Sequence, residues 1–186
     1  MIDLKRLFDI VLSGIGLIFL GWLILILILL AYFDTGKGIF LQKRIGQYGK
    51  IFNIYKICSI KTDGKNISNY STFIRKSKLD EMPQLLNVLL GQMSFVGPRP
   101  DIPGYYDRLE GEDRKILELK PGLTSEASLK YFDEEFILKN KDNPLQYNDT
   151  IIFPDKVKMN LEYYYNQSYY QDLRIIFKTI SKFIRK

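Results

Sequence analysis

The stretch that decides the architecture is "IVLSGIGLIFLGWLILILILLAYF", residues 10–33, which carries no charge between Asp9 and Asp34. At about 1.5 Å of rise per residue, a helix of this length could reach across a hydrocarbon core of roughly 30 Å. A secretory signal peptide fits poorly, because the apolar segment is too long and no A-x-A-like cleavage site follows it. We therefore predict an N-terminal membrane-anchoring helix over residues 1–36 and a single small domain over residues 37–186.

Both flanks of this segment are basic, with Lys5 and Arg6 before it and Lys37, Lys43, Arg44 and Lys50 after it. The positive-inside rule would place both flanks on the cytoplasmic side of a membrane. A single span violates that rule at one flank, whereas a re-entrant helix, which enters and leaves by the same face, satisfies it at both. The length favours a span and the charge favours a re-entrant helix, so both forms stay open on these residues alone.

Composition excludes several classes of protein. The chain has 186 residues, a net charge of +6, one cysteine and no histidine. A disulfide framework is impossible, the usual zinc and iron ligand sets cannot be assembled, and His-activated Ser or Cys nucleophiles are absent. The positive charge suits anionic lipid, phosphorylated substrates or nucleic acid. Any catalytic side chains must therefore be Asp, Glu, Lys or Tyr.

The C-terminal segment "DLRIIFKTISKFIRK" has apolar residues at helical spacing, namely Leu173, Ile176, Phe177, Ile180, Phe183 and Ile184. Basic residues occupy the other positions. Such a helix suits an anionic membrane surface, and the tyrosines just before it favour an interface. The alternative is a terminal helix that packs on the domain core with a solvated basic face.

The rest of the chain predicts an α+β domain that is mainly helical. The expected elements are two strands within residues 39–57 with a turn at 47–49, helices over 66–77, 80–91 and 111–119, a strand over 126–131, and closing helices over 154–166 and 170–185.

Two adjacent carboxylates, Asp80 and Glu81, follow a basic cluster that includes Arg75. Proline is tolerated only in the first turn of a helix, so Pro83 predicts Asp80 as the N-cap and Glu81 in the first turn. The helix dipole would then keep both carboxylates ionised, as nucleophiles or as ligands for Mg²⁺. The alternative is that Asp80 is only a cap.

A further arginine, Arg99, lies between Pro98 and Pro100 in "GPRP". The prolines restrict the backbone, so the guanidinium would be held ready for a phosphate at little ordering cost. A rigid connector with a surface arginine is the alternative. The acid pair, the basic cluster, this arginine and the anchor together favour phosphate chemistry at a membrane surface.

The chain resembles the bacterial sugar transferases that act as monotopic phosphoglycosyl transferases. The matching stretches run nearly end to end: "KRLFDIVLSGIGL", "FLQKRIG", "IFNIYK", "IRKSKLDEMPQLLNVLLGQMSFVGPRPD", "KPGLT" and "NLEYYYNQSYYQDLRIIFKTI". The resemblance implies transfer of a sugar 1-phosphate from a UDP-sugar to polyprenyl (undecaprenyl) phosphate, with release of UMP. It also implies a place in the bacterial inner membrane, at the cytoplasmic face, and the first membrane step of a surface glycan.

The resemblance also implies roles for individual residues. Asp80 would be the nucleophile and Glu81 its partner, with Mg²⁺ bound at this pair. The residues that match phosphate- or substrate-binding positions are Arg75, Arg99, Lys56, Pro98 and Pro100. Asp172 matches a recurrent position without an assigned role.

The chain departs from the family's pattern where Gly21 and Trp22 replace a Ser-Pro break in the membrane helix. It departs again at Cys58, where a basic residue is usual, and at Ser125 and Glu126, in a loop expected to face the nucleotide sugar. The rival class is a non-catalytic scaffold that binds anionic lipid through Arg75, Arg99 and the C-terminal helix. It leaves the acid pair unexplained. Nucleic-acid binding is not expected, because the chain has an anchor and no nucleic-acid motif.

Overall fold

The computed structural model describes residues 4–60 and 68–184, and it is mainly helical with short strands, as the α+β expectation requires. The chain divides into two compact units. Unit 1 comprises Met1–Arg44 and Ile51–Met93, and unit 2 comprises Ile45–Lys50 and Ser94–Lys186. The boundary expected between residues 36 and 37 divides the chain by membrane contact, whereas these units are divided by contacts within the protein. The expected boundary therefore stays a prediction.

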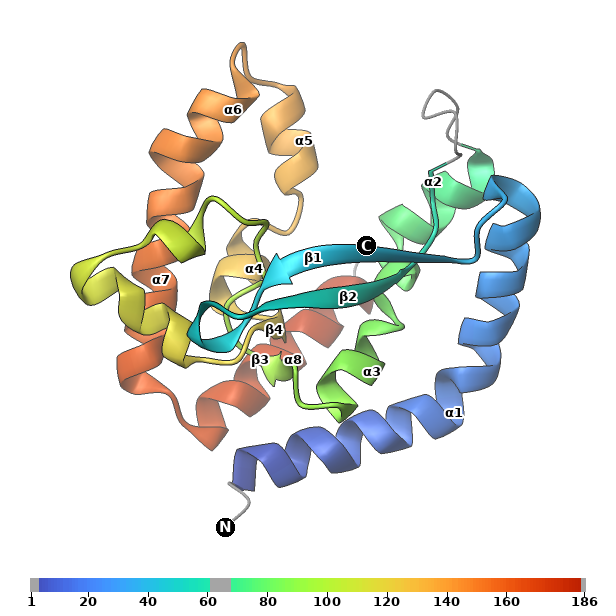
Figure 1. Ribbon diagram of the computed structural model, residues 1–186, viewed down its shortest axis with the longest axis horizontal. Helices are drawn as coiled ribbons and strands as arrows, with labels where there is room; N and C mark the ends of the chain where they lie inside the picture. The colour runs from blue at the N-terminus through green and yellow to red at the C-terminus, as the bar shows by residue number, and fades with distance from the viewer. Residues whose placement is uncertain (1–3, 61–67, 185–186) are drawn as a thin grey trace. The chain divides into compact units, whose positions relative to one another are not determined.

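The described elements of unit 1 are α1 (Leu4–Thr35), β1 (Ile39–Ile45), β2 (Ile51–Ile57), α2 (Asn69–Lys76), the 3₁₀ turn η2 (Leu79–Glu81) and α3 (Gln84–Leu89), with the last residue of β1 counted in unit 2. Helix α1 continues without interruption through Gly21 and Trp22. Figure 1 shows that it is nevertheless curved, so that its two ends run in different directions.

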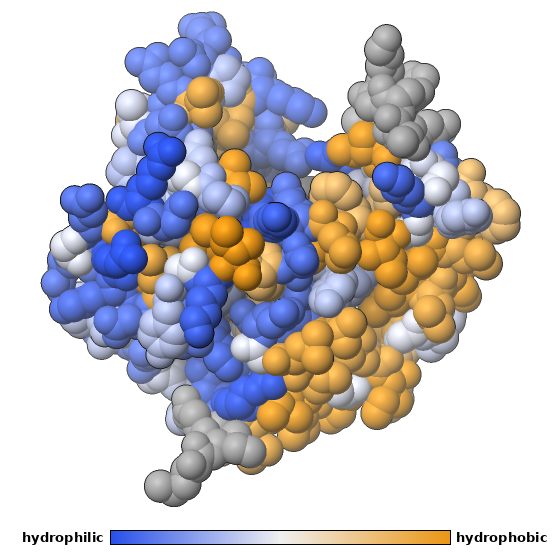
Figure 2. Space-filling model, in the orientation of Figure 1, coloured by the Kyte–Doolittle hydropathy of each residue, from blue (hydrophilic) through white to orange (hydrophobic). Residues whose placement is uncertain are grey.

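Helix α1 is long and apolar enough to cross a membrane. Many of its large apolar side chains are exposed, among them Ile18 at 78% and Phe33 at 77%. Figure 2 shows the resulting hydrophobic surface along the region of α1. Large exposed apolar surfaces of this kind mark sites that contact a lipid bilayer or another protein.

The C-terminal half of α1 is fixed to α2 by a small core of Leu27, Ala31, Ile57 and Ile74. Two polar contacts reinforce this packing. The Tyr70 hydroxyl donates to the carbonyl of Leu27 at 2.5 Å, and Asp34 accepts hydrogen bonds from Ser68 and Ser71. Helix α2 confirms the helix expected over 66–77, of which residues 66 and 67 lie outside the described part.

The expected hairpin is confirmed, because β1 and β2 pair directly through a short connection. The Gly46 N–H donates to the carbonyl of Lys50 at 2.8 Å and closes the turn. Within it, Tyr48 has φ 59° and Gly49 has φ 74°, which is the left-handed region that tight turns use.

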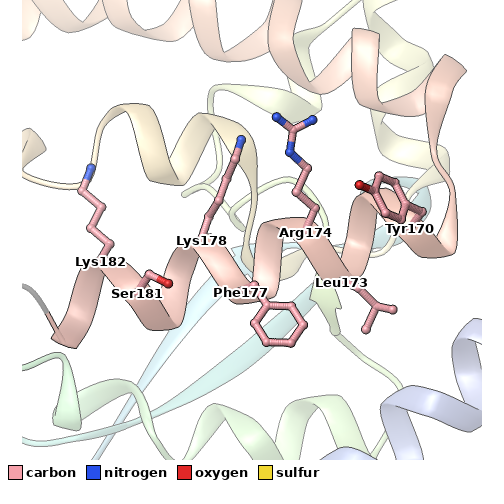
Figure 3. A pocket seen from close by; sticks show the side chains of 7 residues that line it. All are labelled: Tyr170, Leu173, Arg174, Phe177, Lys178, Ser181 and Lys182. Atoms are coloured by element: carbon pink, nitrogen blue, oxygen red, sulfur yellow. The ribbon is translucent and has the colours of Figure 1, made fainter.

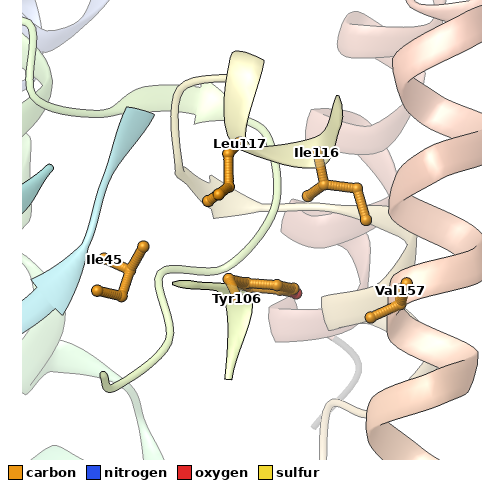
Figure 4. Packing of buried hydrophobic residues seen from close by; sticks show 5 residues of the cluster. All are labelled: Ile45, Tyr106, Ile116, Leu117 and Val157. Carbon is orange, nitrogen blue, oxygen red and sulfur yellow. The ribbon is translucent and has the colours of Figure 1, made fainter. Parts of the chain in front are cut away.

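The elements of unit 2 are η1 (Gln47–Gly49), β3 (Ser94–Val96), η3 (Tyr106–Arg108), η4 (Gly111–Glu118), β4 (Gly122–Thr124), α4 (Glu126–Lys130), α5 (Glu134–Lys139), α6 (Pro144–Tyr147), the π-helical turn η5 (Asn148–Ile152), α7 (Phe153–Asn166) and α8 (Tyr169–Ile184). One core cluster, shown in Figure 4, consists of Ile45, Tyr106, Ile116, Leu117 and Val157. A second consists of Val96, Leu129, Tyr163 and Ile175.

Several local expectations are corrected in unit 2. The strand expected over 126–131 is wrong, because the Ser125 side chain accepts a hydrogen bond from the Ser128 N–H and starts α4. The helix expected over 111–119 is a 3₁₀ segment, η4. The two closing helices are confirmed as α7 and α8, with residue 185 outside the described part.

The parallel pair of β3 and β4 was not expected. Its register sets Ser94 opposite Gly122 and Val96 opposite Thr124. Just beyond β3, the backbones come so close that a Cβ on Gly122 would lie 2.2 Å from the amide nitrogen of Gly97. Only glycine fits such an approach.

Gly122→Ala is therefore expected to destabilise the protein by about 3 kcal/mol, because the clash is with backbone that cannot rotate away. Thermal unfolding in detergent measures the loss. The control is Gly14→Ala in α1, where an added Cβ meets nothing within 4 Å. Equal unfolding temperatures for the two variants would contradict this account of the β3–β4 crossing.

Candidate active site

The acid pair lies in a 3₁₀ turn, not at the start of an α-helix. Helix α2 ends at Lys76, and Lys78 then adopts φ 57°, an unusual conformation for a residue other than glycine. Turn η2 follows, and α3 begins only at Gln84 with Pro83 as its N-cap. The helix expected over 80–91 is present only as Gln84–Leu89, and the expectation of Asp80 as its N-cap is wrong. Pro83 lies before the helix and not inside its first turn.

Asp80 is a buried carboxyl group of unit 1. The residue is only 8% exposed, and the Oδ1 atom of its carboxyl group has no hydrogen-bond partner. Burial, with a smaller contribution from the neighbouring charge of Glu81, raises the pKa of Asp80 to about 6 against the opposing charges of Lys56, Lys78 and Arg75. The expectation that a helix dipole holds this carboxyl firmly ionised is wrong, since no α-helix starts there and burial dominates.

The raised pKa predicts a pH-dependent cost in stability. When the pKa of a carboxyl is higher in the folded than in the unfolded protein, the group stabilises the fold fully at a pH below its unfolded pKa. This stabilisation is lost as the pH rises through the folded pKa. The shift from 3.8 to about 6 corresponds to about 3 kcal/mol. In metal-free buffer, the stability of Asp80→Asn relative to wild type should therefore increase by about this amount between pH 4 and pH 8.

Asp155→Asn is the matched control for this experiment. Hydrogen bonds from Lys130 and Tyr131 lower the pKa of Asp155, so its contribution is present at neutral pH and lost in acid. The control should thus become less stable than wild type as pH rises, with the opposite sign. Parallel pH profiles for Asp80→Asn and wild type would contradict the burial of a charged Asp80.

Glu81 is held by an ion pair. The Lys56 Nζ lies 3.0 Å from the Glu81 Oε1, and both side chains are 16% exposed. Lys56, on β2, was grouped with substrate-binding residues from the sequence. The structure shows its ammonium engaged with the second carboxylate of the pair.

Asn87 positions β2 beside the turn, and sequence reasoning missed it. Its side chain is fully buried on α3; it accepts the N–H of Tyr55 at 3.0 Å and donates to the carbonyl of Asn53 at 2.8 Å. A single asparagine within the apolar run "QLLNVLL" is the signal that could have identified it, since buried amides are retained where they satisfy backbone groups. Its strand contacts bring Lys56 within reach of Glu81.

The structure thus gathers Lys56, Arg75, Lys78, Asp80 and Glu81 in unit 1, with Arg75 in the last turn of α2. The arrangement is a buried acid surrounded by cations. It can hold a phosphate oxygen next to a carboxylate that is mostly ionised at neutral pH.

Arg99 belongs to unit 2, and its membership of the same site stays a prediction. It is exposed, whereas Pro98 and Pro100 on either side are buried. The carbonyl of Pro98 accepts the Gly122 N–H at 2.8 Å. The backbone next to the arginine is therefore anchored, as its position between two prolines suggested.

Helix α8 presents two kinds of side chain, as Figure 3 shows: Arg174, Lys178 and Lys182 point to one side, and Leu173 and Phe177 to the other. Lys178 pairs with Glu126 at 2.7 Å, and Lys182 donates to the carbonyl of Leu129. Glu126, one of the residues that differ from the family's usual pattern, thus joins α4 to α8.

The recurrent acid of this region, Asp172, is buried and accepts a hydrogen bond of 2.5 Å from the Tyr163 hydroxyl. This contact joins α7 to the first turn of α8. It gives Asp172 a structural explanation, since a buried acid with a hydroxyl donor satisfies both groups.

These features accompany a family match over nearly the whole chain. The model of the bacterial sugar transferase family matches residues 2–186, and the chain belongs to this family. The chain is 29% identical over 95% of its length to "Galactosyl transferase CpsE" of Streptococcus agalactiae, of which it covers 41%. It is 33% identical over 98% of its length to the "UDP-glucose:undecaprenyl-phosphate glucose-1-phosphate transferase" of Klebsiella pneumoniae, of which it covers 40%.

A relative of more similar length is the "Exopolysaccharide production protein PSS" of Rhizobium leguminosarum, which is 32% identical over 95% of this chain and covered to 93%. The chain therefore spans about two fifths of the length of the first two relatives and nearly all of this one.

Proposed function

We propose that this protein is a phosphoglycosyl transferase that moves a sugar 1-phosphate from a UDP-sugar to polyprenyl (undecaprenyl) phosphate and releases UMP. The observation that carries the proposal is Asp80, a buried acid with an unpartnered oxygen among cations, in a chain of the sugar transferase family. The donor and acceptor classes are those in the name of the Klebsiella relative. The product would begin a bacterial surface glycan.

The proposed reaction has two displacements at one phosphorus atom. An Asp80 carboxylate oxygen attacks the β-phosphorus of the UDP-sugar, and the bond from that phosphorus to the UMP oxygen breaks. The sugar phosphate is then covalently held on Asp80. A phosphate oxygen of the polyprenyl phosphate attacks the same phosphorus, the bond to Asp80 breaks, and the carboxylate is restored.

Unit 1 offers a reason for nucleophilic power at Asp80. A pKa near 6 leaves the group mostly ionised at neutral pH while making it more basic than an ordinary aspartate. Its unpartnered Oδ1 needs no hydrogen bond broken before it attacks. Lys56 holds Glu81, and we assign to Arg75 and Arg99 the binding of the substrate's phosphates. Pro98 and Pro100 would fix the backbone at Arg99.

The acid pair fits a Mg²⁺ ion. Among the described residues no three His, Cys, Asp or Glu side chains cluster to hold a metal. Mg²⁺, however, usually takes only one or two carboxylates together with waters and substrate phosphates. The Asp80–Glu81 pair provides such carboxylates, and the ion would neutralise phosphate charge when bound.

Membrane association is part of the proposal. The exposed apolar surface of α1 and the two-sided helix α8 suit a protein that lies at a lipid bilayer, with α8 in the interface. We propose that α1 is re-entrant, because both of its flanks are basic and the helix is curved. The catalytic residues would then lie at the cytoplasmic face of the bacterial inner membrane.

Cysteine labelling tests this topology. In a Cys58→Ser background, single cysteines at Lys5 and Lys37 should both be shielded from an impermeant thiol reagent added outside intact cells, and both should react after lysis. Labelling of one flank only, from outside, would establish a single span instead.

The reaction itself is tested with purified protein in detergent, Mg²⁺ and a panel of UDP-sugars, first without acceptor. We expect UMP in an amount equal to the protein and a protein mass increased by one sugar phosphate. Adding undecaprenyl phosphate should discharge this adduct and allow turnover. UMP release only in the presence of acceptor, without an adduct, would argue against the covalent step.

A further inference from the structure

The first turn of α1 holds a contact that the basic-flank reasoning does not require. The Arg6 Nη1 donates to the carbonyl of Val88 at 2.6 Å, and its Nη2 donates to the carbonyl of Leu89 at 2.7 Å. Both carbonyls belong to the last turn of α3, where no later turn of the helix bonds them, and the Val88 carbonyl also accepts the Gly91 N–H at 2.9 Å. A cation at this end also complements the helix dipole.

The chain beyond α3 is shaped to admit the guanidinium. Gly91 has φ +83°, and a Cβ on it would lie 3.1 Å from the Arg6 Nη2. At the opposite end of α3, a Cβ on Gly16 of α1 would lie 3.2 Å from the Leu85 Cδ1. Helix α1 thus contacts α3 closely near both of its ends, with a small residue at each contact.

Helix α3 is also the element to which the acid pair is attached. It begins two residues after turn η2, which contains Asp80 and Glu81. Through Asn87 it holds the backbone of β2, and β2 carries the Lys56 that pairs with Glu81. A shift of α3 would therefore displace both the turn and the cation that holds its second carboxylate.

We infer that Arg6 is a positioning residue, which fixes α3 and, through α3, the Asp80–Glu81 turn to the membrane helix. This inference rests on the proposed function for its catalytic consequence. A basic residue needed only for orientation in the membrane could equally be lysine. The observed contact uses two guanidinium nitrogens on two carbonyls, which a single ammonium on a flexible stem does not reproduce.

The test compares Arg6→Lys with Lys5→Arg in the full chain, reconstituted in lipid nanodiscs. Both variants keep the charge of the flank, so a purely topological role predicts that both behave as wild type. We expect Arg6→Lys to raise amide hydrogen exchange over residues 79–91 about tenfold, and Lys5→Arg to leave it unchanged. We also expect Arg6→Lys to lower kcat for UMP release about tenfold without changing KM for the UDP-sugar.

A second variant approaches the same contact from α3. Gly91→Ala places a methyl group against the Arg6 guanidinium in a conformation that alanine resists, so it should raise exchange over the same residues. Wild-type exchange over 79–91 in Arg6→Lys would overturn the inference, whatever the activity. So would cysteine labelling that shows an altered membrane topology in Arg6→Lys. Absence of UMP release by wild type would instead overturn the proposed function, while exchange still decides whether Arg6 holds the turn.

Discussion

Asp80→Asn is expected to lower kcat for UMP release by at least about 10⁴-fold, which is the scale of loss when a nucleophile is removed. The amide keeps the shape of the side chain but lacks the charge and basicity that a displacement at phosphorus needs. The protein should remain folded, because in wild type this carboxyl is buried at a cost at neutral pH. The measurement is UMP release from the preferred UDP-sugar, together with the mass of the protein after incubation without acceptor.

The two readouts distinguish the possible roles of Asp80. As the nucleophile, Asp80→Asn should show neither turnover nor the sugar-phosphate adduct. If the adduct still forms, another residue attacks and Asp80 acts only in the second displacement. Asp155→Asn, which changes a carboxyl on unit 2 paired with Lys130 at 2.7 Å, should keep wild-type activity and controls for the loss of one carboxylate.

Elements with strong local signals could be predicted from the sequence. The apolar run of residues 10–33 defines α1, and alternation around Gln47–Gly49 defines the hairpin of β1 and β2. The helical spacing of residues 173–184 defines α8. In each of these the determining interactions are close in sequence, so periodicity and turn residues suffice.

The elements that could not be predicted depend on distant partners. Strands β3 and β4 are short, and they exist because Gly97 and Gly122 let two backbones approach. Segment 126–131 is a different case, because its Glu, Ala, Leu and Lys residues favour a helix and the strand expectation misjudged this local propensity. The Ser125 cap starts the helix, and Leu129 packs it against Tyr163 and Ile175.

Some features of the site depend on residues adjacent in the chain and could be predicted, and others depend on distant residues and could not. The acid pair and its basic neighbours were visible in the sequence, because they are adjacent in the chain. The burial of Asp80 and the pairing of Lys56 with Glu81 were not, because they depend on how β2 and α3 pack. The sign of the Asp80 pKa shift was consequently misjudged: a helix dipole would have lowered the pKa, whereas burial raises it.

Arg99→Lys is expected to lower kcat/KM for the UDP-sugar about 10²-fold although the charge is kept. The buried prolines at 98 and 100 and the hydrogen bond of the Gly122 N–H to Pro98 hold the backbone here, so the guanidinium is presented with little freedom to lose. A planar fork can bind two oxygens of one phosphate, whereas an ammonium binds as a point charge. Arg114→Lys, at an exposed arginine in η4 that donates to the carbonyl of Leu109, is the matched control and should be silent. If Arg99→Lys proves equally silent, "GPRP" is a rigid connector, and the phosphates must be bound by Arg75 and the other cations of unit 1.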